Sequence, residues 1–149
     1  MRFHSKQPAA IALLKGDSGM PRLKGTVKFY QMPGGVVVET GVFGLPENSA
    51  GFYGMHIHEG AVCTGNGFPG TGSHFDPKKR MHPSHAGDLP VLIGCAGRAY
   101  SAVLTNRFSM QDILGRTVVI HSDADDYRTQ PAGDSGKKIA CGVIQRYNK

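Results

Sequence analysis

The sequence predicts an all-β fold, either a sandwich or a barrel, on three observations. The 149 residues include 21 glycines and nine prolines, a composition typical of many turns and few long helices. Short runs rich in β-branched and aromatic residues recur along the chain, with turn residues between them. Two long stretches lack any hydrophobic period, and such loops in a compact chain are usually functional. The length fits one domain spanning 1–149.

The first half of the chain contains four expected strands. Residues 9–15 end at Gly16-Asp17-Ser18-Gly19, and residues 24–31 end before Pro33-Gly34-Gly35. Residues 36–43 are rich in valine and end at Gly44-Leu45-Pro46. Residues 52–59 form the fourth run. Turn residues at these ends favour separate short strands over helices.

The second half contains three more expected strands, at 98–108, 116–121 and 138–146. The two stretches without a period occupy 60–97 and 122–137. We expect these stretches to be long functional loops. No internal repeat and no second-domain boundary is evident.

Six of the seven histidines lie between positions 56 and 121, and His4 is the exception. His56 and His58 are two residues apart in an expected strand, so their side chains point to the same face. Met55 and Ile57 then take the opposite face. The pair is either a preorganised half of a metal site or two histidines on a solvated surface.

The first long loop contributes four more residues of metal-binding type, namely His74, His82, His85 and Asp88. The spacing His-x-x-His-x-x-Asp can wrap one ion, and imidazoles with a carboxylate suit zinc. Six imidazoles and one aspartate exceed the needs of one four-coordinate ion, which indicates either two metals or one metal with spare histidines. If there are two four-coordinate metals, His74 must serve both.

Charge and cysteine content limit the other function classes. The formal net charge is +6, but the basic residues are scattered apart from clusters at 78–80 and 137–138. No aromatic pattern interleaves them, so we expect no nucleic-acid partner, and an anionic small substrate suits the charge better. No apolar run is long enough to span a bilayer. The start of the chain lacks the features of a secretory signal, which favours a cytoplasmic location.

Four motifs together resemble the copper/zinc superoxide dismutases, and the short spacings from His82 to His85 and from His121 to Cys141 resemble the bacterial branch of that family in particular. The motifs are Gly54-Met55-His56-Ile57-His58-Glu59, Ser73-His74-Phe75-Asp76-Pro77, His85-Ala86-Gly87-Asp88-Leu89-Pro90 and Leu114-Gly115-Arg116-Thr117-Val118-Val119-Ile120-His121. The resemblance covers nearly the whole chain. It implies an eight-stranded Greek-key β-barrel, an immunoglobulin-like sandwich with two long functional loops. It also implies that the substrate is superoxide, which is converted to oxygen and hydrogen peroxide.

The resemblance also implies which residues bind each metal. Copper is expected on His56, His58, His74 and His121, and zinc on His74, His82, His85 and Asp88. His74 would be the shared ligand and a catalytic residue. Asp125 matches the family's carboxylate that links the free ring nitrogens of His56 and His82, although a solvated loop acid is the alternative.

Three cysteines are present, and the resemblance implies a disulfide between Cys63 and Cys141. The alternative is two reduced thiols, since disulfides are rare in the cytosol. Cys95 has no counterpart in the family. A homodimer is possible, because many relatives are dimers, but the chain carries no decisive patch.

The chain departs from the family pattern where an arginine guides the anionic substrate. Lys138 is at this position, and lysine keeps the charge but loses the planar two-pronged donor. Lys137 can share this role, or both lysines can form a solvated basic edge. The 122–137 loop is short, and Tyr127, Arg128 and Thr129 are candidates to replace its usual channel residues.

Two other functions compete with superoxide dismutation. A copper- and zinc-binding protein of the same fold, with weak or no dismutase activity, would serve metal storage or delivery. A purely structural β-barrel would leave the seven matched ligand positions without explanation.

Overall fold

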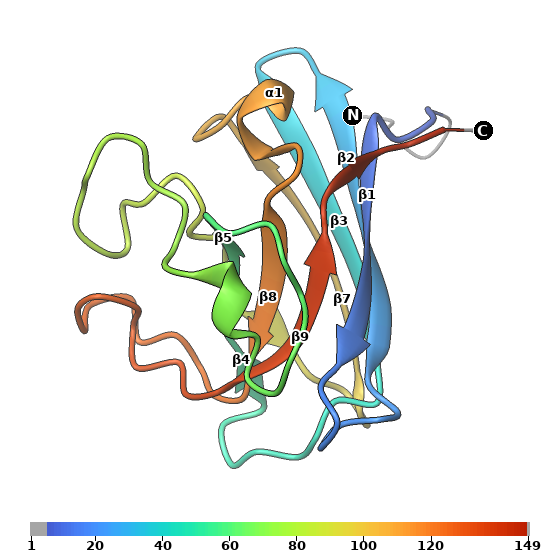
Figure 1. Cartoon of the computed structure of the whole chain (residues 1–149), viewed down its shortest axis with the longest axis vertical. Coiled ribbons are helices and arrows are strands. Elements are labelled where there is room, and N and C mark those ends of the chain that lie inside the picture. The colour runs from blue at the N-terminus through green and yellow to red at the C-terminus, as the bar shows by residue number, and fades with distance from the viewer. Residues whose placement is uncertain (1–5, 149) are drawn as a thin grey trace.

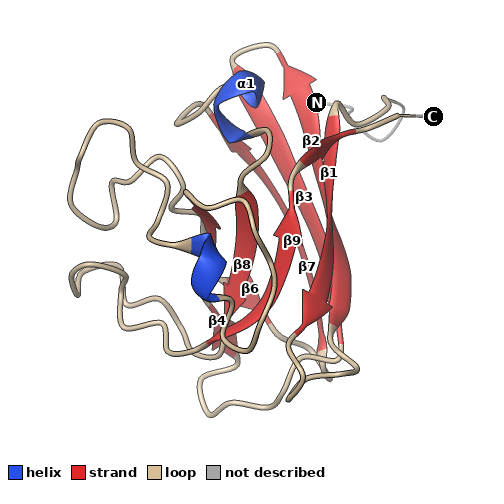
Figure 2. Ribbon diagram, viewed as in Figure 1, coloured by secondary structure: helices blue, strands red, loops and turns tan. Residues whose placement is uncertain are grey.

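The structure, a computed structural model, describes residues 6–148, and antiparallel strands dominate that range (Figure 2). The strands are β1 (Ala10–Gly16), β2 (Lys24–Met32), β3 (Gly35–Phe43), β4 (Phe52–Tyr53), β5 (Met55–His58), β6 (Leu92–Ile93), β7 (Arg98–Thr105), β8 (Thr117–His121), β9 (Lys138–Val143) and β10 (Gln145–Arg146). The described helices are one 3₁₀ turn, Pro69–Thr71, and one α-helical turn, α1 (Met110–Ile113). The predicted all-β class is confirmed.

Eight of the strands join in one curled antiparallel sheet with the order β5-β8-β9-β1-β2-β3-β7, in which β10 also pairs with β1 (Figure 1). The remaining strands, β4 and β6, pair with each other. The first and ninth strands are therefore neighbours although most of the chain separates them. This arrangement agrees with the predicted Greek-key barrel.

The core forms where inward-facing residues of the strands meet. In β1, Ala10, Ala12 and Leu14 are buried and alternate with more exposed neighbours, as a strand with one buried face requires. Val27 and Phe29 of β2 are two residues apart and completely buried, so they share the inner face. β3 adds the buried Val36, Val38 and Val42, and β8 is buried along its whole length, so both strands help to close the interior.

The predicted single strand at 52–59 is wrong, because the chain changes partners at Gly54. β4 pairs with β6, whereas β5 pairs with β8. At the junction, the Gly54 N–H donates to Asp123 O, and Gly54 O accepts from the His121 N–H, both at 2.8 Å. A Cβ at position 54 would lie 2.9 Å from Ser135 Oγ, so the close approach of the 122–137 loop requires glycine.

The other differences from prediction are short elements. β6 and the 3₁₀ turn lie inside the stretch predicted to be loop, the predicted strand at 98–108 ends at Thr105, and α1 was not expected. The predicted strand at 138–146 breaks at Ile144 into β9 and β10. The 122–137 stretch has no helix or strand, as predicted.

The second long loop and most of the first lie on the same side of the sheet, to the left of β8 in Figure 1. One follows β5 and the other joins β8 to β9. β5, which precedes the first loop, and β8 and β9, which flank the second, are neighbours in the sheet. The fold therefore brings both loops to the strands that carry the histidines.

Candidate metal centre

Three of the candidate histidines come from adjacent strands. His56 and His58 on β5 are 0 % and 2 % exposed, and His121, at the end of β8, is 4 % exposed. β5 and β8 pair in register, with Met55 opposite Ile120 and His58 opposite Thr117. The solvated-surface alternative for His56 and His58 is therefore wrong.

The first loop returns to the free edge of β5, which places its candidate ligands beside the strand. The backbone pairs His58 with His74 and His56 with Asp88. Between these pairs, the Ile57 N–H donates to Gly87 O, and Ile57 O accepts from the Phe75 N–H, both at 2.8 Å. These backbone bonds bring candidate ligands from distant parts of the loop beside β5.

Four histidines bring one ring nitrogen each to a common point. His56, His58, His74 and His121 place these atoms within 4.8 Å of one another. His58 Nδ1 lies 2.9 Å from Gly72 O, which leaves its Nε2 atom 3.3 Å from His121 Nε2. Among the described residues, His56 Nδ1 and His74 Nε2 are buried without a hydrogen-bond partner. Buried unpartnered nitrogens are costly, so the group fits a bound cation.

A second group surrounds Asp88. Its carboxylate lies 2.8 Å from His74 Nδ1, and 3.1 Å from both His82 Nδ1 and His85 Nδ1. The ligand atoms of these four residues also lie within 4.8 Å of one another. Three imidazoles and one carboxylate form a donor set typical of zinc. His74 belongs to both groups through its two ring nitrogens.

Asp125 links the two groups, because its carboxylate contacts one histidine of each. One oxygen, Oδ2, lies 2.7 Å from His56 Nε2, and the other, Oδ1, lies 2.8 Å from His82 Nε2. The structure thus puts Asp125 in the predicted linking position, 4 % exposed, and the solvated-acid alternative is wrong. Burial alone would raise the pKa of Asp125, but the hydrogen bonds from His56 and His82 outweigh burial and lower the pKa to about 2.

Gly133 covers the Asp125 carboxylate. Its φ of 73° lies in the left-handed region, and a Cβ there would overlap Asp125 Oδ1 and lie 2.7 Å from His82 Nε2. Glycine therefore meets two demands at this position, one of conformation and one of space.

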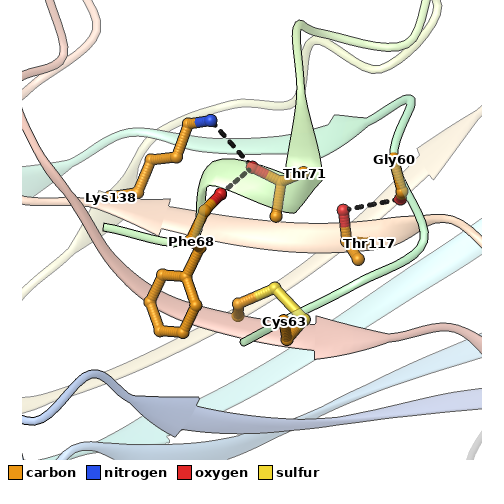
Figure 3. Close-up of a disulfide and its surroundings, with 7 residues drawn as sticks. Gly60, Cys63, Phe68, Thr71, Thr117 and Lys138 are labelled. Atoms are coloured by element: carbon orange, nitrogen blue, oxygen red, sulfur yellow. Dashed lines mark hydrogen bonds between the residues drawn. A yellow bond between two sulfur atoms is a disulfide. The ribbon is translucent and has the colours of Figure 1, made fainter. Parts of the chain in front are cut away.

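A pocket opens to the histidines between the two loops. Its wall includes His58, His74 and His121 together with the stretch 129–132. Lys138, at the start of β9, also lines the pocket and is half-buried. Its ammonium donates to Thr71 Oγ1 at 2.7 Å (Figure 3). It also donates to Gly72 O at 3.0 Å. Burial lowers the pKa of Lys138.

Lys137 is exposed and does not line the pocket. Its backbone forms hydrogen bonds with Ser122. Thr129 lines the pocket, whereas Tyr127 turns away, where its hydroxyl accepts from the Val91 N–H at 2.8 Å. Of the predicted loop residues, Arg128 is also absent from the wall. His4 lies outside the described residues.

Cys63 and Cys141 form the predicted disulfide, which ties the first long loop to β9 (Figure 3). Cys95 is a free, exposed thiol. The disulfide lies in the same region as the 3₁₀ turn that ends at Thr71, so the bond anchors the segment that contacts Lys138.

The buried histidines favour the neutral form that binds metals. Burial lowers the pKa of His58 to about 2 and that of His121 to about 3 from the ordinary 6.5. Burial also lowers the pKa of His56. Neutral imidazole is the ligand form, so the rings need not lose a proton to bind an ion at neutral pH.

The same shifts predict how the stability of the metal-free protein depends on pH. His58 and His121 take up protons in the unfolded chain below about pH 6.5, but in the folded chain only near pH 2 to 3. The free energy of unfolding should therefore fall as pH decreases from 7 to 4, by up to about 1.4 kcal/mol per pH unit for each histidine. Urea unfolding of the metal-free protein across this range tests the prediction. Constant or rising stability would contradict it.

Sequence reasoning missed several residues that hold the first loop. Arg107 donates from one guanidinium nitrogen to Pro83 O at 2.7 Å and to His85 O at 3.3 Å. The Gln130 side chain bonds the backbone of His82. These contacts join loop backbones, and no local pattern in the sequence signals them.

Comparison with known proteins agrees with this geometry. The family model of copper/zinc superoxide dismutase (SODC) matches residues 23–144. A copper/zinc superoxide dismutase of Deinococcus radiodurans is 39% identical over 95% of this chain and 87% of its own. One from Legionella pneumophila is 37% identical over 81% of this chain and 77% of its own. The crystal structure of a double mutant of an SOD-like protein from Bacillus subtilis has a TM-score of 0.77 at 29% identity, covering 91% of this chain and 96% of that one.

Proposed function

The chain belongs to the copper/zinc superoxide dismutase family, and from this premise we propose how its own residues divide the work. It is a superoxide dismutase that uses copper and zinc and converts superoxide to oxygen and hydrogen peroxide. The observation that supports this assignment is that His74 belongs to both groups of candidate ligands, because its two ring nitrogens face different groups.

We assign copper to His56, His58, His74 and His121, and zinc to His74, His82, His85 and Asp88. Two of the buried nitrogens without a hydrogen-bond partner, His56 Nδ1 and His74 Nε2, belong to the first group and support the copper assignment. The Asp88 carboxylate within 3.1 Å of three imidazoles supports the zinc assignment. Asp125 would hold the orientation of one ligand from each group through its two oxygens, a role typical of carboxylates behind metal ligands.

Copper supplies the one-electron exchange with superoxide when it is bound, and zinc has no redox role. The protein supplies a positively charged approach and a place for a proton. Lys138 gives the pocket wall an ammonium group for the anionic substrate. Nε2 of His74 is the atom that can take up a proton when no metal occupies it.

Metal analysis and a chelator test separate this function from metal storage or delivery. We expect bound copper and zinc in equal amounts, and superoxide loss that a copper chelator abolishes. A fully metallated sample without chelator-sensitive activity would contradict the enzyme and favour the storage protein. A sample that binds neither metal would favour the structural barrel.

Lys138→Arg is expected to raise the activity or leave it unchanged, because arginine keeps the charge and adds a planar donor. Lys138→Met removes the charge and should lower kcat/KM at low salt by about tenfold, an effect typical of lost electrostatic steering. Superoxide loss should be measured at several ionic strengths, since added salt should reduce the difference.

Lys137→Met is the matched control, because Lys137 is the exposed neighbour outside the pocket wall. Its activity should stay close to that of the parent. A marked fall for Lys138→Arg, or equal losses for the two methionine variants, would show that another residue guides the substrate.

The homodimer and the cytoplasmic location stay predictions, as does the absence of a nucleic-acid partner. Among the described residues, the helices are too short to cross a membrane. Gel filtration with light scattering of the metallated protein would determine the oligomeric state.

A further inference from the structure

The side chain of Gln130 pairs with the backbone of His82 in the manner of a neighbouring strand. Its amide oxygen Oε1 accepts from the His82 N–H at 2.9 Å, and its amide nitrogen Nε2 donates to His82 O at 2.6 Å. His82 is 3% exposed, so its backbone groups need partners inside the protein. Gln130 provides both from a loop 48 residues away in sequence.

His82 is therefore held at both backbone groups and at one ring nitrogen, Nε2. Its Nε2 lies 2.8 Å from Asp125 Oδ1, and its Nδ1 faces Asp88 at 3.1 Å. Asp125 and Gln130 belong to the same loop, which links β8 to β9. A shift of this loop would move the main chain and the ring of His82 together, and the direction of Nδ1 with them.

We propose that Gln130 is a positioning residue for zinc, which fixes the backbone of His82 so that Nδ1 points into the zinc group. This inference rests on the assignment of zinc to His74, His82, His85 and Asp88. Gln130 also lines the pocket that opens to the copper group. The Gln130 side chain therefore couples zinc binding to the shape of the pocket wall. Zinc binding should influence the position of this wall residue, and a shift of this residue should influence zinc affinity.

The chemistry of the contact explains why glutamine suits this position. A primary amide has a donor and an acceptor side by side, and the backbone of one residue offers the complementary pair. Glutamate keeps the acceptor for the His82 N–H, but its second oxygen would face His82 O without a donor. Alanine loses both bonds.

The test measures zinc affinity in copper-free protein by competition with a chromophoric zinc chelator. Gln130→Ala should weaken zinc binding by about tenfold, the lower end of the effect of residues that support metal ligands. Gln130→Glu should lie between the parent and the alanine variant. The copper affinity of zinc-saturated protein should change by less than twofold. Cobalt bound in place of zinc should show an altered visible spectrum in Gln130→Ala.

Gln111→Ala is the matched control, since Gln111 is an exposed glutamine on α1, away from the pocket. Zinc affinity of Gln130→Ala within twofold of the parent would overturn the inference. So would equal losses of copper and zinc affinity, because they would indicate a general structural role. A parent that binds no zinc would overturn the zinc assignment as well, whereas a parent that binds zinc with an unaffected Gln130→Ala variant would overturn this inference alone.

Discussion

Replacing Asp125 with asparagine is expected to lower zinc affinity by about 10- to 100-fold, the range typical of a lost carboxylate behind metal ligands. If His56 and His82 bind metals through Nδ1, their Nε2 atoms both carry protons and both need an acceptor. The Asp125 carboxylate offers one oxygen to each, at 2.7 and 2.8 Å. An amide of the same shape offers one oxygen and one donor, so one histidine would face an N–H group.

The measurement is zinc and copper affinity by chelator competition for Asp125→Asn and Asp125→Ala. Asp134→Asn is the control, because Asp134 is an exposed residue of the same loop and its left-handed backbone tolerates asparagine. Its metal affinities should match those of the parent. Unchanged affinities in both Asp125 variants would show that the histidines keep their orientation without the link.

Loss of the Cys63–Cys141 disulfide is expected to cost about 4.5 kcal/mol in the free energy of unfolding. The bond closes a loop of 78 residues, and the chain-entropy relation gives this magnitude for such a length. Cys141 is buried beside Phe68 and Val119, so the loop loses a covalent attachment inside a small apolar cluster. Urea unfolding of the Cys63→Ala/Cys141→Ala variant, with metals removed, measures the loss.

Two controls separate the bond from the side chains. Reduction of the parent breaks the same bond without changing packing elsewhere, so the reduced parent should lose a similar free energy. Cys95→Ser should be as stable as the parent, because Cys95 is an exposed free thiol. A reduced parent as stable as the oxidised one would contradict the expected contribution.

The fold class could be predicted from the sequence, but the break between β4 and β5, where the chain changes its pairing partner, could not. Apolar Tyr53, Met55 and Ile57 continue one alternating pattern through Gly54, so nothing local separates β4 from β5. The break is imposed by backbone bonds from Gly54 to Asp123 and His121, residues far along the chain. β6 has two residues, too few to give a period.

The candidate site could be predicted from the sequence to a similar extent. The spacing of His56 and His58 predicted a shared face, and the run from His82 to Asp88 predicted a wrapped ion. The linking position of Asp125 came from the resemblance to the family, because a lone loop aspartate carries no signal of its own. Arg107 and Gln130 were missed, since a side chain that bonds a distant loop backbone leaves no trace in local composition.

For protein engineering, Gly133 is a position that cannot be varied, although it lies between two residues of the pocket wall, Ala132 and Asp134. Any side chain at this position would push into the Asp125 carboxylate, so a library that varies Gly133 would mostly recover proteins without metals. Thr129 and Asp134 line the same opening and are exposed. Changes to the size or charge of the entrance should therefore start from these two positions, with Gly133 held constant.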